Sequence, residues 1–424
     1  MVALNHRRIA LISVHGDPAV DIGKEEAGGQ NVYVRQVGEA LAELGWTVDM
    51  FTRRTNSAQP AVVEHAPRCR TIRLTAGPQE FIPRDEIFDA LPSFLQEFIQ
   101  YQQRLGIRYL LIHTNYWLSA WVGMEYRRRH LGVTHVHTYH SLGAVKYQTV
   151  TDIPPIANKR LEIEKRCLET ASRIVATSPQ EQEHMRSLVS TQGAITIIPC
   201  GTDIRRFGSI QRQEARQKLG LDPRQNIVFY VGRFDRRKGI ETLVRAVGRS
   251  RFATEGNVQL IIGGGSRPGR SDGYERDRIE GIVAELGMSS FTTFPGRIDD
   301  ADLAAYYAAA NVCVVPSYYE PFGLVAIEAM ASYTPVVASD VGGLQFTVES
   351  GNTGLLVPPL DLDGFADAID RILEDPDWQT QLGKAARHRV ESLFSWQGVA
   401  HQLNALYTEL SAEHLPNQFK SSVA

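Results

Sequence analysis

Residues Ser317–Met330, SYYEPFGLVAIEAM, contain the strand-to-helix connection on which the predicted fold class depends. They follow a short apolar run, Val312–Val315, which is typical of a buried strand. After Pro321 and Gly323, small and apolar residues recur in a helical pattern. A buried strand that leads directly into a helix is the repeating unit of parallel α/β sheets.

The same stretch places two carboxylates, Glu320 and Glu328, on either side of the helix start. The first backbone N–H groups of a helix have no partner within the helix, so a helix start can bind an anion. Glu320 could accept hydrogen bonds from sugar hydroxyls there, and Glu328, two turns further on, could hold a ribose diol. The spacing alone fits equally well a structural strand–loop–helix unit with two solvated acids.

Strand and helix patterns alternate along both halves of the chain, which predicts two parallel, doubly wound sheets. The first half has a predicted helix at Val32–Leu44, and its predicted strands are Arg8–Val14, Thr47–Phe51, Tyr109–His113, Thr134–Thr138, Arg173–Thr177 and Ala194–Ile198. The predicted strands of the second half are Ile227–Val231, Val258–Ile262, Thr292–Phe294, Val312–Val315, Pro335–Ala338 and Gly354–Val357. In such sheets, ligands bind at the carboxyl ends of the strands.

A chain of 424 residues is too long for one ordinary core, so we expect two domains. The polar stretch Ile204–Gln225 marks their boundary, which gives a first domain of residues 1–207 and a second of residues 208–395. The pattern from Trp396 onward is helical, and a polar tail follows Pro416.

The composition is that of an ordinary globular protein, with 43% hydrophobic and 22% charged residues. A formal net charge of -3 provides no overall positive field, so nucleic acid is not an expected partner. No apolar run is long enough for a transmembrane helix, and the N-terminal residues do not resemble a signal peptide. The four scattered cysteines follow no metal-ligand spacing, and Cys200 and Cys313 lie in apolar contexts. We therefore expect free, buried thiols and a cytoplasmic location.

Two polar segments of the first half are candidate binding sites. Gly28-Gly29-Gln30 precedes a predicted helix, where glycines permit close backbone approach to a ligand. His140 follows the predicted strand Thr134–Thr138 and so belongs at a strand's carboxyl end. Taken alone, a glycine pair also fits a flexible connection, and a single histidine is more often structural.

The second half has cations at a strand end. Arg233 follows the strand that ends at Val231, and Lys238 lies five residues further on. Two cations fit a sugar-nucleotide diphosphate, although solvated surface charges explain them equally well on residue type alone. Gly263-Gly264-Gly265 follows another strand, but no G-x-G-x-x-G fingerprint or later acid supports a dinucleotide site there.

These motifs together resemble one protein family. E-P-F-G-L-x-x-x-E (from Glu320) and G-R-x-x-x-x-K-G (from Gly232) are similar to the motifs of retaining glycosyltransferases of family four, which includes the sucrose-phosphate synthases. A-G-P (from Ala76), Y-W-L-S (from Tyr116) and H-S-L-G-A-V-K (from His140) resemble segments of relatives with phosphorylated acceptors. The resemblance extends from about residue 13 to 356. It implies the GT-B fold, with two facing Rossmann-like domains, a cleft between them, and a last helix, here within 396–424, that returns to the first domain.

The resemblance also implies roles for single residues. The expected nucleotide-sugar ligands are Gly28, Gly29, Arg233, Lys238, Ile298, Glu320, Phe322, Gly323, Leu324 and Glu328. The expected acceptor ligands are Gln30, Arg84, Tyr116, Ser141, Lys159 and Arg160, with the two arginines on a phosphate. The expected catalytic residues are His140, Glu320, Arg233 and Lys238. His140 would hydrogen-bond the glucosyl group or the departing phosphate and need not be a general base.

Two D-x-D patterns, Asp300–Asp302 and Asp361–Asp363, resemble the metal sites of some sugar-nucleotide enzymes. Both precede helical runs, so we interpret them as helix caps and expect no essential metal and no cofactor.

The expected reaction is transfer of glucose from UDP-glucose to fructose 6-phosphate, which gives sucrose 6-phosphate and UDP. The expected partners are these small molecules, without a nucleic acid or a membrane. Related alternatives are an inositol-phosphate N-acetylglucosaminyltransferase and a sucrose synthase. Alternatives of another class are a nucleotide-dependent dehydrogenase, which requires a nicotinamide fingerprint, and a sugar-binding protein, which requires no diphosphate clamp.

Overall fold

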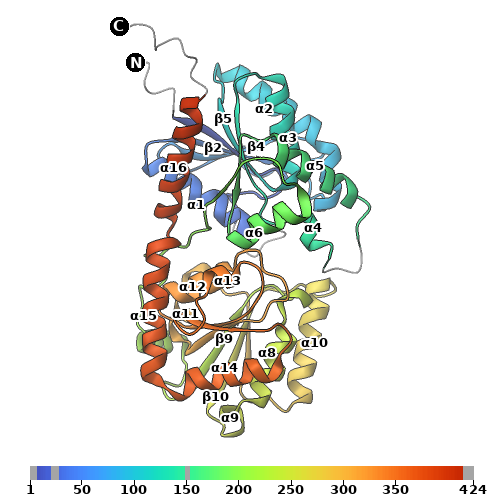
Figure 1. The fold of residues 1–424 in the computed structure, drawn as a ribbon. Coiled ribbons are helices and arrows are strands. Elements are labelled where there is room, and N and C mark those ends of the chain that lie inside the picture. The colour runs from blue at the N-terminus through green and yellow to red at the C-terminus, as the bar shows by residue number, and fades with distance from the viewer. Residues whose placement is uncertain (1–6, 21–27, 149–152, 414–424) are drawn as a thin grey trace, which may run out of the picture. The chain divides into compact units, whose positions relative to one another are not determined.

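The computed structural model describes residues 7–20, 28–148 and 153–413, without the side chains of Asp300 and Glu413. The chain forms two compact units, each built around its own sheet (Figure 1). The first comprises Met1–Pro199 and Trp396–Ala424, and the second comprises Cys200–Ser395. The chain therefore enters the second unit at Cys200, slightly before the predicted position, and the residues from Trp396 onward belong to the first unit.

The first unit contains an eight-stranded sheet in the order β3-β4-β2-β1-β5-β6-β7-β8. All neighbouring strands are parallel except β3 and β4. The strands are β1 (Arg8–Ile12), β2 (Thr47–Arg53), β3 (Val62–Ala66), β4 (Cys69–Leu74), β5 (Leu111–Asn115), β6 (Thr134–Thr138), β7 (Arg173–Ala176) and β8 (Ile195–Ile197). The antiparallel edge strand β3 and its neighbour β4 were not predicted from the sequence.

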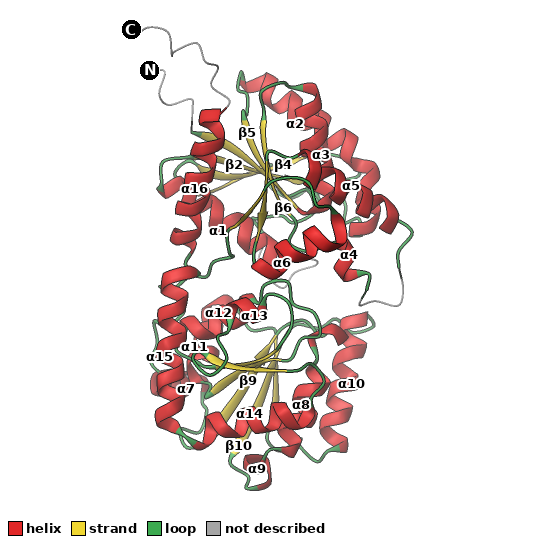
Figure 2. Ribbon diagram, in the orientation of Figure 1, coloured by secondary structure: helices red, strands yellow, loops and turns green. Residues whose placement is uncertain are grey.

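Helices cover both faces of this sheet (Figure 2). They are α1 (Gly29–Glu43), α2 (Leu91–Leu105), α3 (Tyr116–Arg129), α4 (Gly143–Lys146), α5 (Ala157–Thr170), α6 (Pro179–His184) and α16 (Trp396–Glu413), with a 3-10 helix at Arg84–Ala90 and a π-helix at Met185–Val189. Helix α16 packs on α1, where Trp396 contacts Tyr33 edge-on at 5.9 Å. Trp46 donates to Asn404 on α16 at 2.9 Å, so the last helix is an integral part of the first unit.

The second unit contains a six-stranded, wholly parallel sheet in the order β11-β10-β9-β12-β13-β14. Its strands are β9 (Asn226–Val231), β10 (Val258–Gly263), β11 (Thr292–Gly296), β12 (Val312–Val315), β13 (Val336–Ser339) and β14 (Gly354–Val357). Its helices are α7 (Arg212–Leu219), α8 (Ile240–Arg249), α9 (Arg251–Thr254), α10 (Ser271–Glu285), α11 (Asp300–Ala309), α12 (Leu324–Ala331), α13 (Leu344–Thr347), α14 (Leu362–Glu374) and α15 (Pro376–Leu393), with a 3-10 helix at Arg236–Lys238.

The central strands of the second unit are nearly continuous apolar runs. β12 reads VCVV and β13 reads VVAS, and all of their residues are buried. Strands covered by helices on both faces require this composition, because neither face meets water. These runs explain why the sequence predicted the second sheet so closely.

Both sheets contain the six-strand order of doubly wound folds. β4-β2-β1-β5-β6-β7 and β11-β10-β9-β12-β13-β14 each correspond to 3-2-1-4-5-6 in the chain order of their parallel strands. The strand order reverses between β1 and β5 in the first unit and between β9 and β12 in the second. The loops that follow these strands are therefore the expected ligand-binding positions.

Candidate functional site

The predicted acceptor residues of the first unit gather around Tyr116, which follows β5 directly. Arg160 lies over the Tyr116 ring at 5.0 Å, and its Nη1 donates to the Tyr116 hydroxyl at 3.1 Å. Arg84 lies over the same ring at 5.7 Å. Gln30, on α1, donates to Ser13 at 3.0 Å and so lies at the end of β1. Four predicted residues from separate segments thus meet at the reversal point between β1 and β5.

Arg160 is fully buried, and its donors are engaged within the protein. Nε donates to Glu164 at 2.7 Å, and Nη2 donates to the carbonyl of Ser141 at 2.6 Å. Glu164 also accepts the backbone N–H of Gly143, at 2.9 Å from its Oε2. The buried Arg160–Glu164 pair therefore connects α5 to the segments that follow β5 and β6.

His140 lies beyond the end of β6, as the sequence predicted. Its φ is +60°, and Tyr116 has φ +72°, both in the left-handed region that non-glycine residues seldom adopt. Such backbone strain is concentrated at functional sites. Burial lowers the pKa of His140 to about 3, so its imidazole is neutral at ordinary pH.

Lys159 is not part of the Tyr116 group. Its ammonium is exposed and lies over the Phe88 ring at 4.4 Å. Phe88 belongs to the same 3-10 helix as Arg84, so Lys159 contacts that helix through Phe88, whereas Arg84 lies over Tyr116. Gly28 precedes α1 in extended backbone, and the preceding residues 21–27 of the predicted glycine loop lie outside the described residues.

Three residues of this site were missed by sequence reasoning. His15, just after β1, contacts Tyr116 at 4.6 Å, and burial together with Arg84 lowers its pKa well below the usual value. Asn115 and Glu164 are buried and contact His140 and Arg160. Position at a strand's carboxyl end was a signal for the first two, whereas Glu164 lies inside a helix, where nothing in the sequence distinguished it.

In the second unit, the predicted catalytic residues gather at the ends of β9 and β12. Lys238 Nζ pairs with Glu320 Oε2 at 2.5 Å. The Arg233 side chain is exposed, and no hydrogen bond or ion pair joins it to the residues that the structure describes, whereas the Arg233 carbonyl accepts the Tyr230 hydroxyl at 3.4 Å. An exposed cation beside a Lys–Glu pair provides charge for an anionic ligand, and a sugar hydroxyl could compete for Glu320.

The start of α12 is held in place by backbone packing. Gly343 donates to the carbonyl of Glu320 at 2.9 Å, and a Cβ at Gly343 would lie 2.4 Å from Phe322. Gly323 precedes the helix with φ +94°, which favours glycine. The Phe322 ring is buried edge-on against Phe394 at 5.7 Å, so only its backbone is available to a ligand.

Glu328 lies within α12, and its Oε2 accepts the hydroxyl of Tyr307 at 2.7 Å. Tyr307, a fully buried residue of α11, is a partner that sequence reasoning missed. Ile298 follows β11 and lies near Gly263, where an added Cβ would approach it to 2.5 Å. The predicted donor residues therefore surround the carboxyl ends of β9, β11 and β12.

The two D-x-D patterns differ from each other in the structure. Asp361 caps α14 by accepting the N–H of Gly364 at 2.9 Å, as predicted. The cap prediction is wrong for Asp300–Asp302, because α11 begins at Asp300 and its N-cap residue is Asp299, without a side-chain cap bond. Asp302 instead lies in the first turn of α11 and pairs with Lys218 of α7 at 2.8 Å.

One group among the described residues has metal-ligand chemistry: His135, His137 and Cys167, with ligand atoms within 4.8 Å of one another. The Thr114 hydroxyl lies 2.7 Å from a nitrogen of each histidine. Burial raises the pKa of Cys167, which opposes the thiolate form that binds metals. Thr114 thus bridges the two histidines, while His135 Nδ1 and His137 Nε2 are buried without a hydrogen-bond partner among the described residues. All four cysteines are free and buried, as expected for Cys200 and Cys313.

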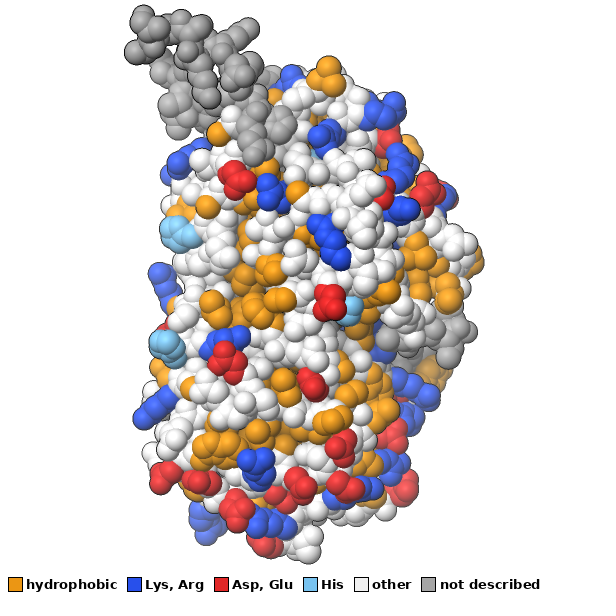
Figure 3. Space-filling model, in the orientation of Figure 1, with side chains coloured by type: hydrophobic (Ala, Val, Ile, Leu, Met, Phe, Trp, Pro, Cys, Tyr) orange, Lys and Arg blue, Asp and Glu red, His pale blue; other side chains and the backbone are white. Residues whose placement is uncertain are grey.

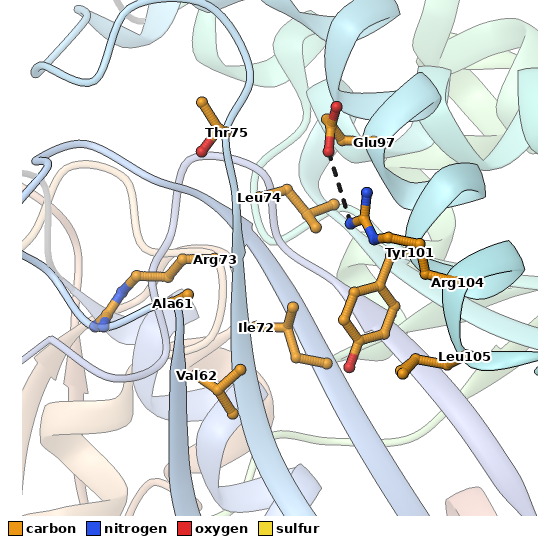
Figure 4. A pocket seen from close by; sticks show the side chains of 10 residues that line it. All are labelled: Ala61, Val62, Ile72, Arg73, Leu74, Thr75, Glu97, Tyr101, Arg104 and Leu105. Atoms are coloured by element: carbon orange, nitrogen blue, oxygen red, sulfur yellow. Dashed lines mark ion pairs between the residues drawn. The ribbon is translucent and has the colours of Figure 1, made fainter.

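A pocket of about 350 Å³ lies elsewhere in the first unit, between β4 and α2 (Figure 4). Figure 4 shows its ion pair, Glu97–Arg104, while the Arg73 side chain points away from the other lining residues. No predicted site residue lines it. On the face drawn in Figure 3, Lys and Arg side chains are interspersed with Asp and Glu, in keeping with the small net charge. Among the described residues, no helix is both long and apolar enough to span a bilayer.

Two family models match the chain. The model "Glycosyl transferase 4-like domain" matches residues 28–201, and "Glycosyl transferases group 1" matches residues 211–389. The D-inositol 3-phosphate glycosyltransferase of Corynebacterium jeikeium is 37% identical, over 95% of this chain and 97% of its own. The chain belongs to the family-four glycosyltransferases.

Solved structures agree with this family. Sucrose-phosphate synthase from Thermosynechococcus elongatus is 55% identical, with a TM-score of 0.88 over 96% of this chain and 100% of the other. An Anabaena protein, HepE, solved in complex with UDP and glucose, is 20% identical with a TM-score of 0.75 over 95% of this chain and 100% of its own. The second likeness concerns the fold alone. The predicted GT-B fold, with two Rossmann-like domains, is confirmed.

Proposed function

We propose that this glycosyltransferase transfers glucose from UDP-glucose to fructose 6-phosphate, with retention of the anomeric configuration. The observation that supports this substrate pair most strongly is the 55% identity to a sucrose-phosphate synthase along essentially the whole of both chains. The residue clusters support it further, because the first unit offers cations for a phosphorylated acceptor and the second offers cations for a diphosphate.

In the second unit, Arg233, Lys238 and the N–H groups at the start of α12 would neutralise the diphosphate. Glu320 would bind glucose hydroxyls after separating from Lys238, and Glu328 would hold the ribose. Positive charge directed at the leaving group stabilises the negative charge that develops as the bond to the sugar breaks. The backbone of Ile298 would meet the base.

In the first unit, Arg84 and Tyr116 would bind the acceptor's phosphate, with Gln30, Ser141 and Arg160 as further acceptor residues, whereas Lys159, which lies over Phe88, is left out of this proposal. The acceptor oxygen forms a bond to C1 of glucose as the bond from C1 to the phosphate oxygen breaks. The hydroxyl proton passes to the departing UDP, so no enzyme nucleophile is required.

A second candidate is transfer of a sugar to D-inositol 3-phosphate, because the curated relatives at 34–39% identity carry that name. The test incubates the full-length protein with UDP-glucose plus fructose 6-phosphate, and separately with UDP-N-acetylglucosamine plus inositol 3-phosphate. Mass spectrometry of the products should find sucrose 6-phosphate in the first mixture. Product in the second mixture alone would replace our proposal with the other candidate.

We also propose that the transfer of glucose does not require a metal ion. After treatment with a chelator, the protein should retain most of its activity. Complete loss that magnesium or manganese restores would contradict this part of the proposal.

A further inference from the structure

The hydrogen bond between His140 and Asn115 defines which nitrogen of His140 carries the proton. His140 Nε2 lies 2.9 Å from Asn115 Oδ1. A neutral imidazole has one donor nitrogen and one acceptor nitrogen, so the partner of one nitrogen determines the chemistry of the other. The remaining nitrogen, Nδ1, forms no hydrogen bond with the residues that the structure describes.

The orientation of the Asn115 amide follows from its other neighbours. Its Nδ2 lies 3.5 Å from the carbonyl oxygen of Ile12 and 3.4 Å from that of His113. Both bonds are long, but the reversed amide would place Oδ1 against two carbonyl oxygens and leave no donor for them. Asn115 is 1% exposed, so water does not compensate for that arrangement.

The His140 ring is fixed by two further restraints. Tyr33, on α1, contacts the ring edge-on at 4.7 Å. The backbone of His140 is held at φ +60°, beyond the end of β6. Asn115 belongs to β5 and precedes α3, so the side-chain bond joins the ends of two neighbouring strands.

We propose that Asn115 is a positioning residue that holds His140 as the Nε2–H tautomer, with Nδ1 as a hydrogen-bond acceptor for a substrate hydroxyl. The second half of this proposal rests on the proposed glycosyl transfer. The proposed tautomer decides whether His140 contacts the glucosyl group or the departing phosphate. An unprotonated Nδ1 accepts a hydrogen bond from a sugar hydroxyl and cannot donate one to a phosphate. Burial keeps the ring neutral, so its tautomer determines whether Nδ1 donates or accepts a hydrogen bond.

The first test measures the tautomer directly and does not depend on activity. The full-length protein is labelled with 15N-histidine, and two-bond 1H–15N correlation spectra identify the protonated nitrogen of each ring. A His140→Gln variant assigns the His140 signals. At neutral pH, we expect Nε2 to be protonated and Nδ1 unprotonated, and the opposite tautomer or an even mixture would overturn the proposal.

Two substitutions test the role of Asn115. Asn115→Asp retains an oxygen acceptor for Nε2–H, so Nε2 should stay protonated even if the carboxylate adds a second proton at Nδ1, whereas Asn115→Leu removes the acceptor and should give a mixture of tautomers. If the leucine variant does not fold, the aspartate variant still decides, because loss of the proton from Nε2 in that variant contradicts the proposal. An unchanged tautomer in a folded leucine variant contradicts it as well.

Tyr407→Phe is the matched control. The Tyr407 hydroxyl lies 2.6 Å from Nδ1 of His113, a buried histidine in the same sheet. This variant loses a hydrogen bond to a buried histidine that has no proposed role at the site. The His140 signals should stay unchanged, and a shift as large as that of Asn115→Leu would show that the tautomer reports general packing.

The last test adds ligands to the labelled wild type. UDP-glucose should move the Nδ1 signal of His140 while Nδ1 remains unprotonated, whereas UDP alone should leave it in place. Protonation of Nδ1 by UDP alone would show that His140 contacts phosphate and would overturn the inferred role. Failure of UDP-glucose to bind at all would contradict the proposed donor, and hence the inferred hydroxyl partner, while leaving the measured tautomer standing.

Discussion

The two units have similar sheets but bury different kinds of side chain behind them. In the described part of the first unit, the buried Asp, Glu, Lys, Arg and His residues are Asp17, Asp49, Arg53, Arg73, His113, His135, His137, Arg160, Glu164 and Glu181. Among the described side chains of the second unit, the buried residues of these five types are Arg216 and Glu275. The first unit therefore orients its site through a buried polar network, whereas the second places exposed and half-buried charges on a conventional apolar core.

Different interactions hold the two sites in place. In the first unit, Arg160 and Glu164 reach from α5 to two strand-end segments, and leaving either partner unpaired is costly in a buried position. In the second unit, glycines such as Gly343 let backbone segments pack directly on the start of α12. Charge substitutions should therefore affect stability in the first unit and mainly catalysis in the second.

Acid should produce the largest difference in stability between the two units. Burial lowers the pKa of His113, His135 and His140 to about 3, whereas unfolded histidines bind a proton below about pH 6.5. Between these values the unfolded state binds more protons, so the free energy of unfolding falls as pH is lowered from about 6.5 towards 3. Each histidine contributes up to about 1.4 kcal/mol per pH unit.

The second unit has one histidine, His388, which is exposed. Hydrogen exchange of the full chain, corrected for intrinsic rates, should show β5 and β6 losing protection at a higher pH than β9 and β12. Simultaneous loss in both units would contradict the comparison.

Removing one partner of a buried ion pair should have the next largest effect. Arg160→Ala leaves the Glu164 carboxylate buried without its cation, so stability should fall by about 3–5 kcal/mol. Arg251→Ala is the control, since Arg251 pairs with Glu374 at 2.6 Å on the second unit and both side chains are exposed. It should lose much less, because an exposed ion pair contributes little to stability. Denaturant unfolding measures both, and equal losses would show that burial does not distinguish the units.

The charges of the second unit should matter for turnover. Arg233→Ala and Lys238→Ala should each lower kcat by about a hundredfold or more, because each removes charge from the leaving group. Their melting temperatures should change little, since both side chains lie at the surface or near it. Arg245→Ala, which removes a partly exposed pair with Glu241, should stay within about twofold of wild-type turnover. Near-normal kcat in both test variants would remove them from the proposed clamp.

Tyr307→Phe should have the smallest effect. It removes the hydroxyl that donates to Glu328, and one hydrogen bond is worth about 1 kcal/mol, so KM for UDP-glucose should rise about fivefold. Tyr306→Phe, a neighbour that stacks on Phe229, is the control and should leave KM unchanged. Equal changes of KM in the two variants would show that the Tyr307 hydroxyl has no specific role in nucleotide binding.

The sequence predicted the central strands of the second sheet because their apolar runs are nearly continuous. In the first sheet it missed β3 and β4, and the run of β4 is interrupted by Arg70 and Arg73. In the structure these arginines pair with Asp49 and Asp17, residues distant in sequence, and the pairs make charged residues acceptable within the sheet. Such partners cannot be identified before the topology is known.

The same limit applies to the candidate site, where some residues could be predicted from the sequence and others could not. Tyr116, His140, Arg233 and Glu320 could be predicted as site residues because motif and strand-end position agree. Glu164 was not found, because its importance arises from contacts to Arg160 and Gly143 on other elements. Arg160 was predicted to bind phosphate, and the structure adds that three of its N–H groups already serve Glu164, Tyr116 and Ser141.

The central claim is that the first unit recognises the acceptor's phosphate while the second unit binds the nucleotide sugar. The most direct test compares kcat/KM for fructose 6-phosphate and for fructose in wild type, Arg84→Ala and Arg233→Ala. Wild type should prefer fructose 6-phosphate, and Arg84→Ala should lose about ten- to a hundredfold of that preference, the value of a charge-assisted hydrogen bond. Arg233→Ala should lower both values equally and keep the ratio. An unchanged ratio in Arg84→Ala, or a wild type that prefers free fructose, would contradict the account.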